Sequence, residues 1–537
     1  MRFFDIIYIS KNFVYKQLTY FIIKKLLKVD LLDIYGKLLK GNKMFVKPYD
    51  DSDPKSIEEY ASKLVGFSFS DVIYNASNNE YEYKALVDYY KSPYGKGSLG
   101  NLLERLYFFY QPNSDPRPDF PKAGVELKVT PYEYTKKGQL KAGERLVLSM
   151  IPFDRPLEDD LEESHLLEKI QLMLLIFYLR DREKLRTDYR IGYVNLFHLL
   201  SEQTKEDFEI IKADYKKIVD KIRAGKAHEL SEADTMYLGA CTKGATAKSS
   251  YRSQYYSDIP AKSRAFSLKQ SYMRYMLNHY IVNEVETYQP AFTDEDLKHS
   301  DFETMVLNKI NSYVGSKAND LYKKFNLKAN VKSVNHLIVM RILGVNTENA
   351  QEFEKANIQI KTIRVRKDGK LREHMSFPNF VIKDFIDEDW DNSEIYELFS
   401  QTKFMFVVFK ENESGEDILQ GAKFWTMPVK DLENKGKNEW KMFQEKFLEG
   451  INFRVKENTK GGYIVDNDIP TAKDTDIFHV RLHSSQTAYI IDGVKYGKGS
   501  ESNMDTLSNG DKMTKQCFWL NKDYIKEQIE ELIKGKD

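Results

Sequence analysis

Apolar residues recur at helical spacing in three parts of the first half of the chain. Residues 56–64, 98–109 and 202–222 each predict a helix with one apolar face. In SLGNLLERLYFF the apolar face consists of Leu99, Leu102, Leu103 and Leu106. Glu104 and Arg105 lie beside that face, so Glu104 is a polar group carried by a packed helix.

Alternating or continuous apolar runs predict strands elsewhere. VELKV (residues 125–129) and RLVLSMIPF (residues 145–153) are typical of strands, with KKGQL as the turn between them. The run SHLLEKIQLMLLIFYL from Ser164 starts either as a capped helix or as part of a buried strand, and both alternatives stay open. TKFMFVVFK (residues 402–410) predicts a strand of the second half.

The pattern is repeated along the chain. KSVNHLIVMRILG repeats KGSLGNLLERLYF, FEKANIQIKTIRV repeats FPKAGVELKVTPY, and MTKQCFWLNKDYIKEQI repeats KSRAFSLKQSYMRYML. The three repeats occur in the same order and are much too far apart for a solenoid. They predict a duplicated fold with a join near residues 285–300.

Composition sets the class of protein. The 537 residues suffice for two or three domains, and 81 Lys and Arg balance 81 Asp and Glu. Zero net charge argues against attraction of the whole molecule to nucleic acid, but leaves local basic patches open. The two cysteines have no metal-ligand spacing, which fits free thiols in a reducing cytoplasm.

The first 43 residues differ from the rest. Their apolar runs are interrupted by Asp5, Lys11, Lys16 and Lys24, so they predict neither a membrane span nor a signal peptide. Three readings remain: sequence translated upstream of a true start at Met44, a membrane-surface helix, or a helical extension.

One short segment carries candidate chemistry. In VELKV, Glu126 and Lys128 share a strand face, and Asp119 lies in the turn that feeds the strand. Two carboxylates can hold a hard divalent cation, and a lysine can share the charge of a phosphodiester under attack. Glu-x-Lys also occurs at Glu82, Glu433 and Glu439, so an ordinary solvated strand face is the alternative.

The wider sequence resembles the MutH family, which includes a mismatch-repair nicking endonuclease and Sau-type restriction endonucleases that cleave at GATC. SLGNLLERLYF, DFPKAGVELKVTP and SHLLEK carry the resemblance, and HELSEADTMYLGACTKGA with YSDIPAKSRAFSLKQSYM favours the restriction branch. The resemblance implies an α/β (α+β) PD-(D/E)xK restriction-endonuclease-like fold with a mixed central sheet flanked by helices. It also implies Mg²⁺ at Asp119 and Glu126, and the catalytic set Glu104, Asp119, Glu126, Lys128 and Lys169. Lys169 has a second reading as a lysine that extends from apolar surroundings to solvent, and His165 is read as packing or capping.

A basic stretch predicts DNA contact. Between residues 240 and 274, basic and aromatic side chains are interleaved with a single acid, Asp258, which suits phosphate binding, although a solvated loop is the alternative. The resemblance places the GATC-reading loops here, and the residues expected to contact DNA are Lys243, Lys248, Arg252, Arg264, Ser267 and Lys269. This chain departs from the repair enzyme at Cys241-Thr242-Lys243 and at Ser267.

The second copy lacks the acidic set. Glu352, Gln359 and Lys361 occupy the places of Asp119, Glu126 and Lys128, and the amide of Gln359 adds no charge to a divalent site. The resemblance implies an effector domain that binds a second copy of the DNA sequence. The residues expected to contact that DNA, because their side chains suit phosphate and base contact, are Arg481, His483, Lys515 and Trp519. A purely structural domain is the alternative.

We therefore expect a cytoplasmic type II restriction endonuclease that cuts double-stranded DNA at GATC and leaves 5′-phosphates. Residues 44–290 would form the catalytic domain and residues 291–537 the degenerate effector domain. The functional partner would be a DNA methyltransferase of the same restriction-modification system, and a monomer with one site would cut twice or pair on DNA. A strand-nicking repair enzyme and a non-catalytic looping protein are the alternatives. Methylation sensitivity and the solution oligomer are left open.

Overall fold

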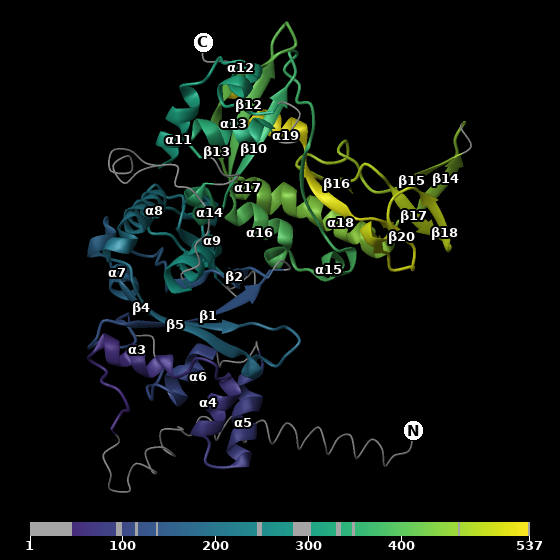
Figure 1. Cartoon of the computed structure of the whole chain (residues 1–537). Coiled ribbons are helices and arrows are strands. Elements are labelled where there is room, and N and C mark those ends of the chain that lie inside the picture. The colour runs from purple at the N-terminus through teal and green to yellow at the C-terminus, as the bar shows by residue number, and fades with distance from the viewer. Residues whose placement is uncertain are drawn as a thin grey trace, which may run out of the picture.

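The computed structural model describes residues 46–92, 99–112, 116–135, 138–243, 250–282, 302–328, 334–345, 350–459 and 462–534. The predictions for residues 1–43, for Lys248 and for a join near residues 285–300 lie outside these described residues. In Figure 1 the purple and blue first half of the chain lies below the green and yellow second half. Within the described ranges, no helix is both long and apolar enough to cross a bilayer.

A mixed sheet forms the centre of the first half. Its strand order is β2-β1-β4-β5, with β1 parallel to β4 and both outer strands antiparallel to their neighbours. The strands are β1 (Glu126–Tyr134), β2 (Leu140–Ala142), β4 (Leu172–Leu179) and β5 (Arg190–His198). Helix α7 (His165–Ile170), capped by the Ser164 hydroxyl, leads directly into β4, so the run after Ser164 contains both a helix and a strand.

Strand β4 is buried on both faces, as a parallel strand covered by helices should be. Leu174 and Ile176 belong to one core, and Met173, Leu175 and Phe177 belong to the other. The first core includes helices α3 (Pro54–Ser62), α4 (Phe69–Ala76), α5 (Glu80–Tyr90) and α6 (Leu99–Leu106). The second core includes α7, α8 (Lys205–Arg223) and α9 (Gln270–Tyr275). The helices predicted at residues 56–64, 98–109 and 202–222 correspond to α3, α6 and α8.

A second, smaller sheet lies beside this one, with the order β3-β9-β6. Its strands are β3 (Leu146–Met150), β6 (Leu238–Thr242) and β9 (Arg264–Leu268). The prediction that KKGQL connects VELKV directly to RLVLSMIPF is wrong in one respect. The turn leads into β2, which pairs back on β1, and the chain then enters the other sheet as β3.

The second half repeats both sheets. β10 (Ile358–Val365), β12 (Lys403–Glu411) and β13 (Asp417–Trp425) have the order and directions of β1, β4 and β5. β11 (Met375–Asn379), β21 (Gln516–Leu520) and β16 (Phe478–Leu482) have the order of β3, β9 and β6. The helices of this half include α11 (Phe302–Asn311), α12 (Ala318–Lys324), α13 (Val334–Ile342), α16 (Glu394–Gln401), α18 (Lys437–Glu449) and α19 (Lys522–Gln528). The duplicated fold predicted from the sequence repeats is confirmed.

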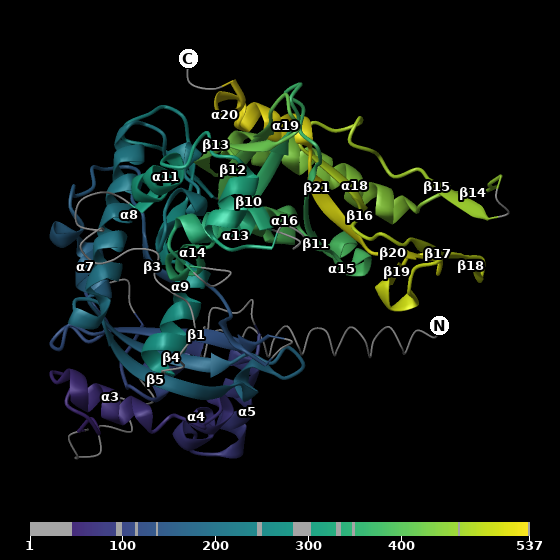
Figure 2. The same ribbon diagram turned by 45° about the horizontal axis from the view of Figure 1, so that its top comes forward.

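An arm of strands extends from the second half, at the right of Figures 1 and 2. It contains the hairpin of β14 (Phe453–Glu457) and β15 (Tyr463–Asn467). It also contains a sheet in the order β18-β17-β20-β19. These strands are β17 (Ala488–Ile491), β18 (Val494–Gly497), β19 (Met504–Thr506) and β20 (Lys512–Thr514).

The two halves share a core and a buried ion pair. One hydrophobic cluster contains Met173 of β4 together with Met405 and Val407 of β12, so it extends from one central sheet to the other. Helix α14 (Gln351–Ala356) packs on α9, as Figure 2 shows. There Lys355 Nζ lies 2.8 Å from Asp207 Oδ1, with both side chains almost fully buried.

The other carboxylate oxygen of Asp207 is also satisfied. It accepts hydrogen bonds from the hydroxyls of Tyr272, at 2.9 Å, and Tyr280, at 2.7 Å. A buried charge with this many partners is costly to disturb. The contact therefore fixes α14 of the second half to α8 of the first.

We predict that Lys355→Met lowers the free energy of unfolding by about 3 kcal/mol, because it leaves Asp207 as a buried charge without its cation. The measurement is the urea midpoint of the transition that separates the halves. The matched control is Lys216→Met, which removes the exposed ion pair with Asp220 and should cost less than about 1 kcal/mol. Equal shifts for the two variants would contradict the role given to Lys355.

Candidate active site

Glu126 is a buried carboxylate at the first position of β1. The residue is 3% exposed, so the solvated strand face considered from the sequence is wrong for it. Lys128 Nζ lies 2.8 Å from its Oε1 atom. Lys169 Nζ lies 3.2 Å from Oε1 and 3.4 Å from Oε2. Two ammonium groups therefore compensate the buried charge.

Lys169 reaches Glu126 because of the parallel pairing of β1 and β4. Glu126 is opposite Met173 in the register, and Lys169 lies just upstream in the last turn of α7. The helix is fixed at its start by the Ser164 cap and buries Leu166 and Ile170. The alternative that Lys169 extends freely to solvent is therefore wrong: its ammonium is directed at the carboxylate.

Asp119 lies in the turn before β1. The turn closes through an antiparallel bridge between Phe120 and Val125, and Asp119 Oδ2 accepts a hydrogen bond from Leu127 N at 2.9 Å. Burial, reinforced by the negative charge of Glu126, raises the pKa of Asp119 to about 6. The hydrogen bond from Leu127 N thus holds the half-buried Asp119 carboxyl group in place near the carboxylate of Glu126.

Glu104 belongs to the same cluster and comes from α6. Leu99, Leu102 and Leu103 bury the apolar face of this helix, which leaves Glu104 partly buried toward the acids. Burial first, and then the charge of Asp119, raise the pKa of Glu104 to about 7. The structure therefore brings together all five residues predicted for catalysis: Glu104, Asp119, Glu126, Lys128 and Lys169.

The charges of this cluster suit a hard divalent cation. The cluster contains three carboxyl groups and two ammonium groups, and the pKa values of Glu104 and Asp119 are raised first by burial and then by the neighbouring carboxylate charge. Among the residues described, no three acidic, histidine or cysteine side chains form a complete ligand set. Asp119 and Glu126 offer carboxylate oxygens, the donor type that hard divalent cations take.

His165 and Tyr110 differ in their surroundings. His165 is largely exposed, with Nδ1 3.3 Å from Glu168 Oε2, as expected for a residue at a helix start. Tyr110 was not predicted from the sequence, yet its hydroxyl is buried where the charges of Asp119, Glu104 and Glu126 act on it. No signal in the aromatic run YFFYQ distinguishes Tyr110 from its neighbours.

The residues predicted to contact DNA in the first half fall into two groups. Lys243 and Arg252 are exposed. Arg264, Ser267 and Lys269 are at most 5% exposed in this conformation. Lys248 lies outside the described residues.

The buried members take part in polar contacts within the β3-β9-β6 sheet. Arg264 Nη1 donates to Ala240 O at 2.7 Å, and Lys269 Nζ lies within hydrogen-bond distance of Thr235 O. Burial lowers the pKa of Lys269 to about 8. These side chains tie the middle strand β9 to β6 and to the segment that precedes β6.

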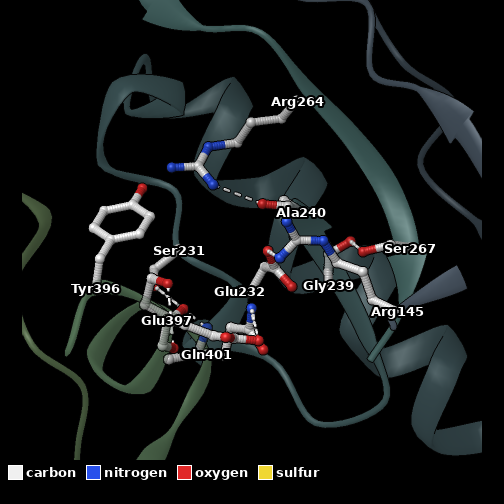
Figure 3. A network of polar contacts seen from close by, with 12 residues as sticks. Arg145, Ser231, Glu232, Gly239, Ala240, Arg264, Ser267, Tyr396, Glu397 and Gln401 are labelled. Carbon is white, nitrogen blue, oxygen red and sulfur yellow. Dashed lines mark hydrogen bonds and ion pairs between the residues drawn. The ribbon is translucent and has the colours of Figure 1, made fainter. Parts of the chain in front are cut away.

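Figure 3 shows this contact between the halves. Arg145 forms an ion pair with the buried Glu232, and the guanidinium of Arg264 faces Tyr396 of α16. Ser231 Oγ donates to Ser400 O across the contact at 3.0 Å. A cavity of about 360 Å³ between the halves is lined by these residues, and nearby Lys262 pairs with Glu433.

The position equivalent to the acidic cluster has changed in the second half. Gln359 and Lys361 lie on β10 as Glu126 and Lys128 lie on β1, and burial lowers the pKa of Lys361. Glu352 is buried in α14, a helix that replaces the turn around Asp119. The place of Glu104 is taken in α13 by Val339 or its neighbour Met340, and both are fully buried. These groups do not reproduce the charged set of the first half.

Three of the four predicted effector residues lie together. The guanidinium carbon of Arg481 is 3.9 Å from the centre of the Trp519 ring, and the His483 ring meets the same indole edge-on. Arg481 and His483 are exposed, whereas Trp519 is buried and donates from Nε1 to Arg481 O at 3.1 Å. Lys515 is partly buried between β20 and β21, and its main-chain N–H donates to Asn503 O.

Comparisons with known proteins agree with this geometry. Residues 108–214 match the family described as the DNA mismatch repair enzyme MutH. The DNA mismatch repair protein MutH of Vibrio campbellii is 26% identical over 239 residues, which cover 44% of this chain and 98% of that protein. MutH of Vibrio parahaemolyticus has the same identity and coverage.

A longer match extends over both halves. The type II restriction enzyme Sau3AI of Staphylococcus aureus is 34% identical over 461 residues, which cover 82% of this chain and 93% of that enzyme. The match therefore includes the part of the second half that the MutH proteins lack. The chain belongs to the Sau3AI family of type II restriction enzymes, and residues 108–214 of its first half match the MutH family as well.

Proposed function

We propose that this protein is a Mg²⁺-dependent restriction endonuclease that cleaves both strands of DNA at GATC and leaves 5′-phosphates on 5′ overhangs. The observation that carries the proposal is the buried Glu126 carboxylate, held by Lys128 and Lys169 and facing Asp119 and Glu104. The GATC sequence itself rests on the resemblance of the run around residues 228–273 to the restriction branch of the family.

The proposed reaction is hydrolysis of one phosphodiester bond. A divalent cation held by Asp119 and Glu126 supplies positive charge beside the phosphate and lowers the pKa of a water molecule. The water oxygen attacks phosphorus, the bond from phosphorus to the 3′ oxygen breaks, and a proton passes to that leaving oxygen. No covalent intermediate with the protein is needed.

The lysines have a defined place in this scheme. The ammonium groups of Lys128 and Lys169 donate hydrogen bonds to Glu126. Each ammonium group has further N–H donors, which can bind phosphate oxygens as negative charge develops on them. Glu104, whose pKa is raised to about 7 by burial, is suited to exchange a proton near neutral pH. Exposed Lys243 and Arg252 are proposed to bind backbone phosphates, while Lys248, Arg264, Ser267 and Lys269 remain proposals from the sequence.

The two halves are proposed to have different roles. Residues 44–290 would cut, and residues 291–537 would bind a second GATC sequence and stimulate cutting. Exposed Arg481, which lies over the Trp519 ring, and exposed His483, which meets that ring edge-on, support such a contact with DNA. One intact site implies that the enzyme cuts the two strands in turn or pairs with another molecule on DNA.

The alternatives are less well supported. A strand-nicking repair enzyme would not need the second half, which the MutH relatives do not cover. A looping protein without catalysis would not need a buried acid with two lysines in one half only. A cytoplasmic enzyme of the proposed kind would also require a DNA methyltransferase that protects the host's own GATC sites.

The direct test uses plasmid DNA with several GATC sites and Mg²⁺. We predict linear fragments for the native protein and at least about 100-fold slower cutting for Asp119→Ala, since that variant loses a cation ligand. Retained DNA binding by Asp119→Ala in Ca²⁺ would separate chemistry from binding. The control, Asp154→Ala, changes an exposed acid and should cut at the native rate. Nicked circles would favour the repair function, and retarded but uncut DNA would favour the looping function.

Cleavage should depend on pH through Glu104 and Asp119. Both pKa values are raised mainly by burial, to about 7 and about 6. Protonation removes the charge with which Asp119 would hold the cation and the ability of Glu104 to accept a proton. The rate should therefore fall as the pH decreases from about 7.5 to about 5.5. Higher Mg²⁺ should move this fall to lower pH, because the cation competes with protons. A cleavage rate that does not change with pH over this range would contradict the roles given to Glu104 and Asp119.

The same groups predict the pH dependence of stability without a cation. A carboxyl group whose pKa is raised on folding binds its proton more tightly in the folded state. Its contribution to stability is therefore largest at acidic pH and declines as the pH rises through about 6 to 7. Mg²⁺ should offset this decline, which thermal unfolding with and without Mg²⁺ at each pH can measure.

The role of the second half is tested by Arg481→Ala. We predict normal cutting of a plasmid with one GATC site, but loss of the several-fold stimulation by an added GATC duplex, because the guanidinium on Trp519 no longer meets that DNA. The control is Lys441→Ala on the exposed face of α18, which should retain stimulation. Equal stimulation of both variants would remove Arg481 from the proposed effector contact.

A further inference from the structure

Tyr110 is held at the acidic cluster by its own main chain. Its N–H donates to Glu104 O at 3.0 Å, so the chain that leaves α6 folds back onto the residue that carries the helix carboxyl group. The fold-back requires Phe109 to adopt a φ of 59°, in the left-handed region that is rare for a bulky residue. Such conformations persist where surrounding structure imposes them, and they are concentrated at functional sites.

The ring of Tyr110 is fixed from the other side by Phe120. The two rings meet edge-on, with their centres 5.4 Å apart and their planes at 76°. Phe120 directly follows Asp119 and is itself buried. Tyr110 is therefore tied to the helix of Glu104 by its backbone and to the turn of Asp119 by its ring.

The hydroxyl of Tyr110 is buried without a hydrogen-bond partner among the residues that the structure describes. Other tyrosines close by do have partners. Tyr49 donates to Phe108 O at 2.6 Å, and Tyr107 donates to Tyr60 O at 2.7 Å. A buried polar group without a hydrogen-bond partner lowers the stability of the folded protein, and such groups are rare. The Tyr110 hydroxyl, which has no such partner in the described part of the chain, therefore indicates a role other than stabilising the fold.

The surroundings of the hydroxyl make it a donor. Burial, followed by the charges of Asp119, Glu104 and Glu126, raises the pKa of Tyr110 well above its ordinary value. The phenol therefore keeps its proton at neutral pH and offers an O–H group among acceptor oxygens. A phenylalanine would fill the same space against Phe120 without the orphan group.

We propose that Tyr110 is a positioning residue of the nuclease site, whose hydroxyl donates a hydrogen bond to a water or phosphate oxygen that enters the acidic cluster with the divalent cation. The inference rests on the proposed function for the identity of that oxygen. It goes beyond the set of acids and lysines, because the hydroxyl gains its hydrogen-bond partner when the cation enters, from a water oxygen in the free protein or from a phosphate oxygen when DNA is bound.

The test compares Tyr110→Phe with Tyr107→Phe. For Tyr110→Phe we predict an unfolding midpoint of the cation-free protein that is unchanged or higher, because no hydrogen bond is lost. Single-turnover cleavage of a GATC duplex should slow by about tenfold, the effect of one hydrogen bond to a charged group. The Mg²⁺ concentration for half-maximal rate should rise, and calorimetric titration of Mn²⁺ into the free protein should show weaker binding.

Tyr107→Phe should behave in the opposite way. It loses a hydrogen bond of the native fold, so its unfolding midpoint should fall while its Mg²⁺ dependence stays native. The inference is overturned if Tyr110→Phe matches the native protein in rate and cation binding, or if it loses stability and rate without a change in cation dependence. If the native protein fails to cut, the proposed function is wrong, and equal Mn²⁺ binding by native protein and Tyr110→Phe then overturns the role of Tyr110 separately.

Discussion

The arrangement of the first half depends on how the buried charge of Glu126 is compensated. A carboxylate in the protein interior is tolerated only with close cationic or hydrogen-bonding partners. Lys128 comes from the same strand, but Lys169 comes from a helix 43 residues further along the chain. It arrives there because β4 pairs in parallel with β1 and α7 directly precedes β4. The register of the parallel pair β1 and β4 therefore determines that Lys169 reaches Glu126.

The second half shows what happens when that charge is removed. Gln359 needs no cationic partner, and α16, which occupies the place of α7 before the parallel strand, contains no lysine in EIYELFSQ. The turn around Asp119 is replaced by α14, whose Lys355 pairs with Asp207 of the first half. The segment that carries Asp119 of the acidic cluster in one copy thus serves as a contact between the copies in the other.

That contact joins the two halves closely. A shared hydrophobic core lies between the central sheets, and the sheet that contains Arg264 and Ser267 is covered by α16 and its neighbours. Polar contacts such as Ser231 with Ser400 and Lys262 with Glu433 bridge the same boundary. A shift of the second half relative to the first would therefore change the packing around strand β9 and its buried basic residues.

The sequence by itself determined the local structure and much of the chemistry. Helical and strand periodicity located α3, α6, α8, β1 and β12, and the three repeats revealed the duplication, because apolar patterns are set by local geometry and burial. Asp119, Glu126 and Lys128 were recognised because they lie within one short segment. The tertiary structure alone decided that Lys169 meets Glu126, that Tyr110 is enclosed among the acids, and that Ser267 and Lys269 are buried. Those outcomes depend on strand register and on packing between distant segments, which no local pattern encodes.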